Sequence, residues 1–216
     1  LYHFLFQPDD YLCRLFVSTD IDFRQPLRFV YTGGLSGTRS PRTLLSALNI
    51  LQHQGELNDI KLQFDFAGQF DRSARRQIEQ SRLPFIKSHG QLSFKQSRDL
   101  LQRATCPVLI DTPPSAGDRT LHLPSKLLDY VLCRKRVVAL TKSESPTDRF
   151  LSQGYGIACS SDDPAAIAVT IKAITDAFRG NNHAFFSTPP PPETHSAKLN
   201  AERLAQLFQN VLSEEK

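Results

Sequence analysis

Residues 28–54, "RFVYTGGLSGTRSPRTLLSALNILQHQ", contain the clearest structural pattern in the chain. It begins with a short, mostly apolar run that ends in glycine, which is typical of a buried β-strand. After a polar loop, Ser40 and Pro41 precede a segment in which apolar residues recur at helical spacing, and proline is common in the first turn of a helix. The stretch therefore predicts a strand, a loop and a helix, in that order.

The same alternation continues along most of the chain. Further strands are predicted at residues 60–68, 85–90, 106–112, 136–141 and 155–161, and further amphipathic helices at 71–82, 93–104, 123–132, 145–154 and 163–178. Repeated strand–helix order is typical of a parallel sheet covered by helices on both faces. We therefore predict an α/β fold with a doubly wound, Rossmann-like parallel sheet.

The two ends of the chain follow different patterns. Residues 1–25 are aromatic and charged without a clear period, and we interpret them as a connector from an N-terminal domain outside this sequence. The predicted domain covers residues 26–180. Residues 181–216 include four consecutive prolines at 189–192, which favour an extended spacer, and a final amphipathic helix at 197–215. We expect no regular structure in residues 179–198.

Composition limits the classes of function. The 216 residues carry a formal net charge of +4 from 26 basic and 22 acidic residues, which is too mild to indicate a nucleic-acid partner. The four cysteines have no zinc-ligand spacing and are expected to be reduced, buried thiols. No apolar run approaches the roughly 20 residues that span a bilayer. We expect a cytoplasmic protein that needs no metal or cofactor.

The loops after the strands are the places to look for a ligand site, because ligands of open parallel sheets bind beyond the carboxyl ends of the strands. The first loop, "TGGLSGTRSPR", brings glycines and two arginines to a helix start, which suits an anion, although a solvated surface turn would also explain it. Its glycine spacing matches neither a dinucleotide-binding loop nor a P-loop. After the third strand, His89 and Gly90 are candidates for contact with a flat heterocycle, or His89 is an ordinary residue beside a helix.

The stretch "LPSKLLDYVL", residues 123–132, carries a third group of polar candidates. Pro124 in the first turn leaves the amides of Ser125 and Lys126 without partners inside the helix. Lys126 and Asp129 are three residues apart and project from one side of the helix near its positive end. The alternative is that these two side chains only form a surface pair, which would contribute a few tenths of a kcal/mol.

Taken together and in order, four segments resemble glycosyltransferase family 4, in its C-terminal, nucleotide-sugar-binding half of the two-domain GT-B architecture. They are "YTGGLSGTRSPRTLLSAL" at 31–48, "HG" at 89–90, "PSKLLDYVLCRKRVVAL" at 124–140 and "GYGIACSSDDPAAIA" at 154–168. The resemblance covers about residues 26–178. It implies a hexosyltransferase-like enzyme that transfers a sugar from a UDP- or GDP-sugar with retention at the anomeric carbon, in glycan or polysaccharide synthesis.

The resemblance also implies roles for individual residues. The donor's diphosphate would lie against the turn at Gly33 and Gly34 and near Ser125, with Arg39 and Lys126 stabilising the charge that develops as it departs. The base would lie beside His89 and Gly90, and the ribose hydroxyls would bind Asp129.

This chain departs from the family pattern at its two acidic positions. Asp129 replaces the usual Glu, and Leu121 stands where the family has its first acid. These departures motivate the alternative that the chain is a catalytically decayed, GT-B-like binding or assembly module; a sugar-nucleotide epimerase of the same architecture is a weaker third option. The acceptor would bind the N-terminal domain, so this chain alone is expected to bind a nucleotide and transfer little sugar. Peripheral association of the full-length protein with the inner face of a membrane stays open.

Overall fold

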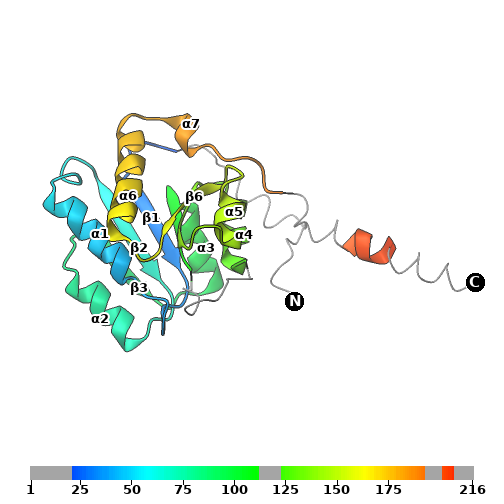
Figure 1. The fold of residues 1–216 in the computed structure, drawn as a ribbon, viewed down its shortest axis with the longest axis horizontal. Helices are drawn as coiled ribbons and strands as arrows, with labels where there is room; N and C mark the ends of the chain where they lie inside the picture. Colours follow the sequence, from blue (N-terminus) through cyan, green and yellow to red (C-terminus); the bar gives the residue numbers. More distant parts are fainter. Residues whose placement is uncertain (1–20, 112–122, 193–200, 207–216) are drawn as a thin grey trace, which may run out of the picture.

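Six parallel strands form the centre of the fold. The computed structural model describes residues 21–111, 123–192 and 201–206. Within them lie β1 (Leu27–Thr32), β2 (Leu62–Ala67), β3 (Ile86–Gly90), β4 (Cys106–Ile110), β5 (Val137–Thr141) and β6 (Gly156–Ser160). All neighbouring strands pair in parallel, in the order β3-β2-β1-β4-β5-β6 (Figure 1). The order reverses between β1 and β4, which is the switch point at which doubly wound sheets bind ligands.

Helices cover both faces of this sheet, as the sequence predicts. The helices are α1 (Arg42–His53), α2 (Arg72–Gln80), α3 (Phe94–Gln102), α4 (Ser125–Leu132), α5 (Pro146–Leu151), α6 (Pro164–Arg179) and α7 (His183–Phe186). Figure 1 shows α1, α2 and α6 on one face of the sheet and α3, α4 and α5 on the other. Buried side chains of each group form a separate core with the sheet. Each predicted strand and helix between residues 28 and 178 is present, with ends that shift by a few residues.

The alternation of side chains along β1 shows why one strand serves two cores. Phe29 and Tyr31 point to the face covered by α1 and α6, and the ring of Phe29 stacks on Phe64 of β2 at 5.4 Å between centroids. Val30 lies in the core on the opposite face. A strand with helices on both sides buries both of its faces, so its sequence is a nearly continuous apolar run.

The segment after α6 differs from the prediction. Residues 179–198 were expected to lack regular structure, but α7 forms one short turn of helix there. Phe186 of α7 is 3% exposed and its ring packs against Phe23 and Phe178. The hydroxyl of Tyr155 also donates to the carbonyl of Pro190 at 2.9 Å. Burial of the Phe186 ring stabilises the folded state, which explains why this segment packs on the sheet domain.

Other predictions about the ends of the chain lie mainly outside the described residues. Of the predicted connector, the structure describes only residues 21–25, where Ile21 and Phe23 pack against the core. Of the predicted final helix at 197–215, it describes residues 201–206, which are helical and exposed. Leu121 is also outside the described part of the chain.

Candidate functional site

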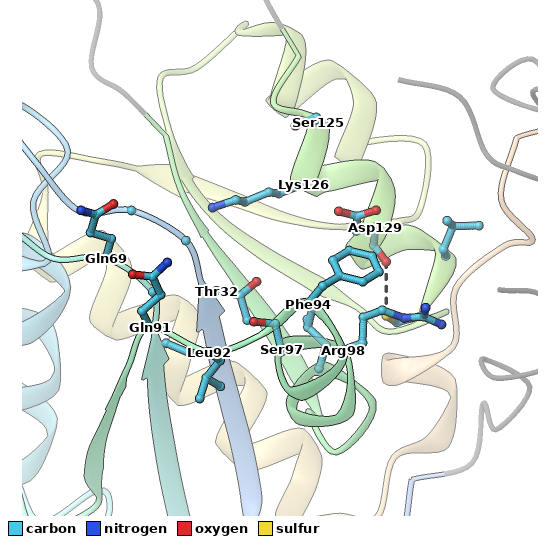
Figure 2. Close-up of a pocket in the computed structure, with 17 residues that line it drawn as sticks. Thr32, Gln69, Gln91, Leu92, Phe94, Ser97, Arg98, Ser125, Lys126 and Asp129 are labelled. Carbon is cyan, nitrogen blue, oxygen red and sulfur yellow. Dashed lines mark hydrogen bonds between the residues drawn. The ribbon is translucent and has the colours of Figure 1, made fainter. Parts of the chain in front are cut away.

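A cleft of about 500 Å³ opens at the carboxyl edge of the sheet, beside the switch point. Its walls are the ends of β1 and β2 with the loops that follow them, the connection from β3 into α3, and one side of α4 (Figure 2). Five of the predicted residues line it: Gly33, Gly34, Ser125, Lys126 and Asp129. Its size is within the range of pockets that hold small-molecule ligands and cofactors.

The helix α4 is held against β1 by Tyr130. The Tyr130 hydroxyl donates to the carbonyl of Thr32 at 3.1 Å and accepts the amide of Thr32 at 3.2 Å. Burial raises the pKa of Tyr130 to about 12, so this hydroxyl stays protonated at neutral pH. Because Tyr130 follows Asp129 directly, these bonds place the polar side of α4 beside the end of β1.

Lys126 reaches across the cleft from α4 toward the loop after β1 (Figure 2). Gly33 has a φ of +149°, and a Cβ at this position would collide with Lys126 Nζ. Gly68 at the end of β2 has a φ of +141°, and its missing Cβ leaves room for the carbonyl of Gly33. The positive φ favours glycine at both positions, and at Gly68 the backbone carbonyl of Gly33 leaves no room for a side chain.

The electrostatic surroundings of Lys126 favour an anion. Burial lowers the pKa of Lys126 below its ordinary value, the nearby Arg39 guanidinium lowers it further, and Asp129 partly opposes both effects. Pro124 supplies no side-chain cap to α4, and Ser125 and Lys126 in the first turn of this helix both line the cleft. The Lys126 ammonium therefore belongs to the positive end of a helix, with the Arg39 guanidinium near enough to influence it, and these surroundings suit an anion.

Arg39 lies near this group but does not line the cleft. It lines a neighbouring hollow between α1 and α2, and it interacts with the hydroxyl of Tyr31, which itself donates to the carbonyl of Gly34 at 2.7 Å. Arg39 belongs to the same loop as Gly33 and Gly34, influences Lys126 through its charge, and interacts with the Tyr31 hydroxyl of β1. Its direct contact with a diphosphate stays a prediction.

His89 and Gly90 lie at the end of β3 and do not line the cleft. His89 Nε2 lies 2.6 Å from Oδ1 of Asp65, a fully buried carboxylate of β2 that also pairs with Arg28 at 3.6 Å. The imidazole therefore anchors β3 to β2, which fits the interpretation of His89 as an ordinary structural residue. The cleft is lined instead by the next two residues of the chain, Gln91 and Leu92.

Phe94 and Arg98 of α3 are cleft residues that the sequence reading missed. The Phe94 side chain is 72% exposed, and the Arg98 guanidinium lies 5.4 Å from the centroid of its ring. Phe94 and the buried Leu101 are seven residues apart, so they lie on one side of α3, and both line the cleft. Helical spacing alone therefore assigns Phe94 to the buried side of this helix, and only the packing of α3 shows that its ring stays exposed.

Asp111 follows β4, yet it does not line the cleft. Its buried carboxylate accepts hydrogen bonds from the hydroxyls of Thr141 and Thr147, at 3.0 Å each, and so joins β4 to β5 and α5. Asp129 is therefore the carboxylate that lines the cleft among the described residues.

Within residues 21–111, 123–192 and 201–206, no three His, Cys, Asp or Glu side chains gather as a metal site would require. Among the same residues, no helix is both long and apolar enough to span a membrane. Cys106, Cys133 and Cys159 are free and buried, as predicted, and burial raises the pKa of each thiol.

Neither a protein-family model nor a curated protein sequence matches this chain. Solved structures do. S. aureus MnaA, in a co-structure with UDP, superposes with a TM-score of 0.61 at 10% identity over 88% of this chain and 46% of that one. The N-terminal domain of Candida albicans trehalose-6-phosphate phosphatase gives 0.55 at 11% identity, over 76% and 38%. The pneumococcal O-GlcNAc transferase GtfA, in complex with UDP and GlcNAc, gives 0.54 at 16% identity, over 87% and 36%.

These similarities define the fold class. The chain has a six-stranded, doubly wound, Rossmann-like α/β domain, which confirms the predicted fold class. It spans less than half the length of the solved structures that it matches. At identities of 10 to 16% the comparison establishes the fold alone, and membership of glycosyltransferase family 4 stays a prediction.

Proposed function

We propose that this chain is the donor-binding half of a glycosyltransferase, and that the cleft binds a nucleotide diphosphate sugar. The observation that carries the proposal is the position of the Lys126 ammonium, which faces the Gly33 turn at the positive end of α4. Structures of the same fold that contain UDP, from S. aureus and pneumococcus, support UDP over GDP as the first nucleotide to test.

In this proposal each wall of the cleft has a part. The diphosphate lies between the Gly33–Gly34 turn and the start of α4, where Lys126 and the helix amides stabilise negative charge on the departing group. The Asp129 carboxylate accepts hydrogen bonds from the ribose hydroxyls. The base lies beyond β3 against Leu92 and the exposed ring of Phe94, since an aromatic face next to a cationic guanidinium stacks well on a flat heterocycle.

A transfer reaction also requires an acceptor and a group that accepts its proton. The described residues of the cleft offer one carboxylate, Asp129, and the imidazole of His89 is bonded to Asp65 outside it. We therefore place the proton acceptor, and the site that holds the reacting end of the acceptor, on a partner domain, with retention at the anomeric carbon as in the resembled family. The same shortage of acids favours the second candidate, a module with this fold that binds a nucleotide or a partner without catalysis.

Titration calorimetry with UDP and with GDP tests the proposal. We expect UDP to bind below millimolar concentration, and Phe94→Ala to weaken binding about tenfold, since one stacked base contributes about 1–3 kcal/mol. Val169→Ala is the matched control, because Val169 is 70% exposed on α6, on the opposite face of the sheet. Binding of neither nucleotide, or equal affinities for Lys126→Ala and the unmodified chain, would rule out a functional donor site.

The second candidate is separated from the first by turnover. Full-length protein that binds UDP and hydrolyses or transfers sugar from a UDP-sugar supports the enzyme. Full-length protein that binds UDP, folds normally and turns over no sugar in a panel of donors supports the binding module.

A further inference from the structure

Beside the cleft, α2 and the start of α1 present a group of exposed arginines. We define the arginine surface as Arg42, Arg72, Arg75 and Arg76, all four of which are exposed. Arg42 lines a hollow of about 310 Å³ together with polar side chains of the loop after β1 and of α2. The three arginines of α2 line a second hollow of about 480 Å³. Asp71 lines both hollows, so the surface is continuous.

The charge of this surface is not neutralised within the protein. In the described part of the chain, none of the four arginines forms an ion pair with a carboxylate. The carboxylate of Asp71 instead caps α2, where it accepts the amide of Ala74 at 2.7 Å and the amide of Gly37 at 3.2 Å. These hydrogen bonds lower the pKa of Asp71. Glu79 is the other acid that lines the second hollow, so positive charge predominates.

The arginine surface adjoins the donor cleft through two loops. The loop after β1 contributes Gly33 and Gly34 to the cleft and leads into Arg42. The loop after β2 contributes Gln69 to the cleft and leads into Arg72. A chain that extended from the cleft over these loops would therefore pass directly across the arginines.

From this arrangement we infer that the arginine surface binds a polyanionic acceptor, a glycan chain that carries carboxylate or phosphate groups. The inference rests on the proposed function, since it supplies the acceptor side of the same site. Arginine suits this partner because its planar guanidinium can donate two parallel hydrogen bonds to a carboxylate or a phosphate. Each of the two hollows would hold one anionic group of the glycan and fix its orientation. A flat surface would not fix that orientation.

Two other polyanions fit the surface less well. A membrane surface is disfavoured because the exposed large apolar side chains of the described residues are Phe94, Val169 and Leu204, and none lies on α2 or at the start of α1. A nucleic acid is disfavoured by the mild net charge of +4. The one aromatic residue that lines either hollow, Phe70, is buried, so no exposed aromatic ring there could stack on a base.

Fluorescence anisotropy with two labelled probes, polygalacturonate and polyphosphate, tests the inference. The variant Arg72→Gln/Arg75→Gln/Arg76→Gln is compared with Lys87→Gln/Arg103→Gln/Arg149→Gln, which loses the same charge at exposed positions on β3, after α3 and on α5. We expect at least one probe to bind the unmodified chain, the first variant to bind it about tenfold more weakly, and the control to change little. The first variant should also show a weaker dependence of affinity on salt.

Several outcomes would overturn the inference: no binding of either probe, equal losses in the two variants, binding of anionic phosphatidylglycerol vesicles without either polymer, or tighter binding of duplex DNA than of both probes. Calorimetry of UDP on the same variants separates this inference from the proposed function. Both variants should keep the unmodified affinity for UDP. If UDP binds none of the proteins, the proposed function is contradicted. If UDP binds but neither probe binds the unmodified chain, only the inferred acceptor site is contradicted.

Discussion

At the scale of single residues, the surroundings of Lys126 cost stability and suit its proposed role in binding a diphosphate. Its ammonium is partly buried beside the Gly33 turn, and burial together with Arg39 lowers its pKa. A neutral side chain at this position would avoid the cost of desolvating an ammonium, so the stability of the domain does not explain the lysine. An anionic ligand that pairs with the ammonium would explain it.

Lys126→Met should therefore stabilise the chain at neutral pH while it abolishes UDP binding. The folded pKa lies below the unfolded value of about 10.4, so the unfolded chain holds more protons between these values and stability rises with pH there. The gain from Met should be a few tenths to about 1 kcal/mol at pH 7, given partial screening by solvent, and part of it should vanish near pH 10.5. Urea unfolding at both pH values measures this, with the exposed Lys142→Met as a control that shows no such difference.

His89 has a structural partner that the sequence did not indicate, while its contact with a base stays a prediction. An imidazole at the end of a strand of an open sheet is a reasonable candidate for ligand contact. The sequence does not reveal that Asp65, 24 positions earlier, lies beside it on the neighbouring strand. A buried carboxylate requires hydrogen-bond partners, and His89 supplies one of them.

At the scale of elements, the position of α4 against β1 determines whether the cleft exists. The three interactions between Tyr130 and Thr32 tie the polar side of this helix to the strand end that carries Gly33. The apolar periodicity of "LPSKLLDYVL" predicted the helix, but it did not identify the tyrosine as its anchor.

Tyr130→Phe removes this anchor with little change of shape. It leaves the amide of Thr32 without its buried acceptor, so we expect a loss of about 1–3 kcal/mol in the free energy of unfolding and several-fold weaker UDP binding. Tyr155→Phe is the matched control, because it removes one hydroxyl bond, to Pro190, at a site away from the cleft. A similar loss of UDP affinity in both variants would contradict the positioning role of Tyr130.

At the scale of the whole molecule, the domain includes more of the chain than its strand–helix pattern indicates. Phe23 and Phe186, which enter and leave the domain at its two ends, pack on each other and on Phe178 of α6. The predicted boundary at residue 180 therefore divides a packed cluster, and the contacts extend to Pro190.

Phe186→Ala should lower the free energy of unfolding by about 3 kcal/mol, as expected for a large side chain removed from a core. UDP affinity should be unchanged, since α7 is not part of the cleft. Val169→Ala, at an exposed position of α6, should cost little stability. A loss for Phe186→Ala no greater than that of Val169→Ala would contradict the assignment of α7 to the domain.

The elements and their order follow from the sequence alone. Apolar runs and helical periodicity are local properties, so the alternation that begins at residues 28–54 predicted the doubly wound sheet. Of the site residues that the resemblance implied, 33, 34, 125, 126 and 129 line one cleft, and their contact with a ligand stays a prediction. Only the tertiary structure decided that Lys126 faces Gly33, that Asp65 holds His89, that Phe94 stands exposed at the cleft, and that α7 packs on the core. Each of these depends on contacts between segments distant in the chain, or on the side of a helix that packing leaves open, and neither is written in local sequence.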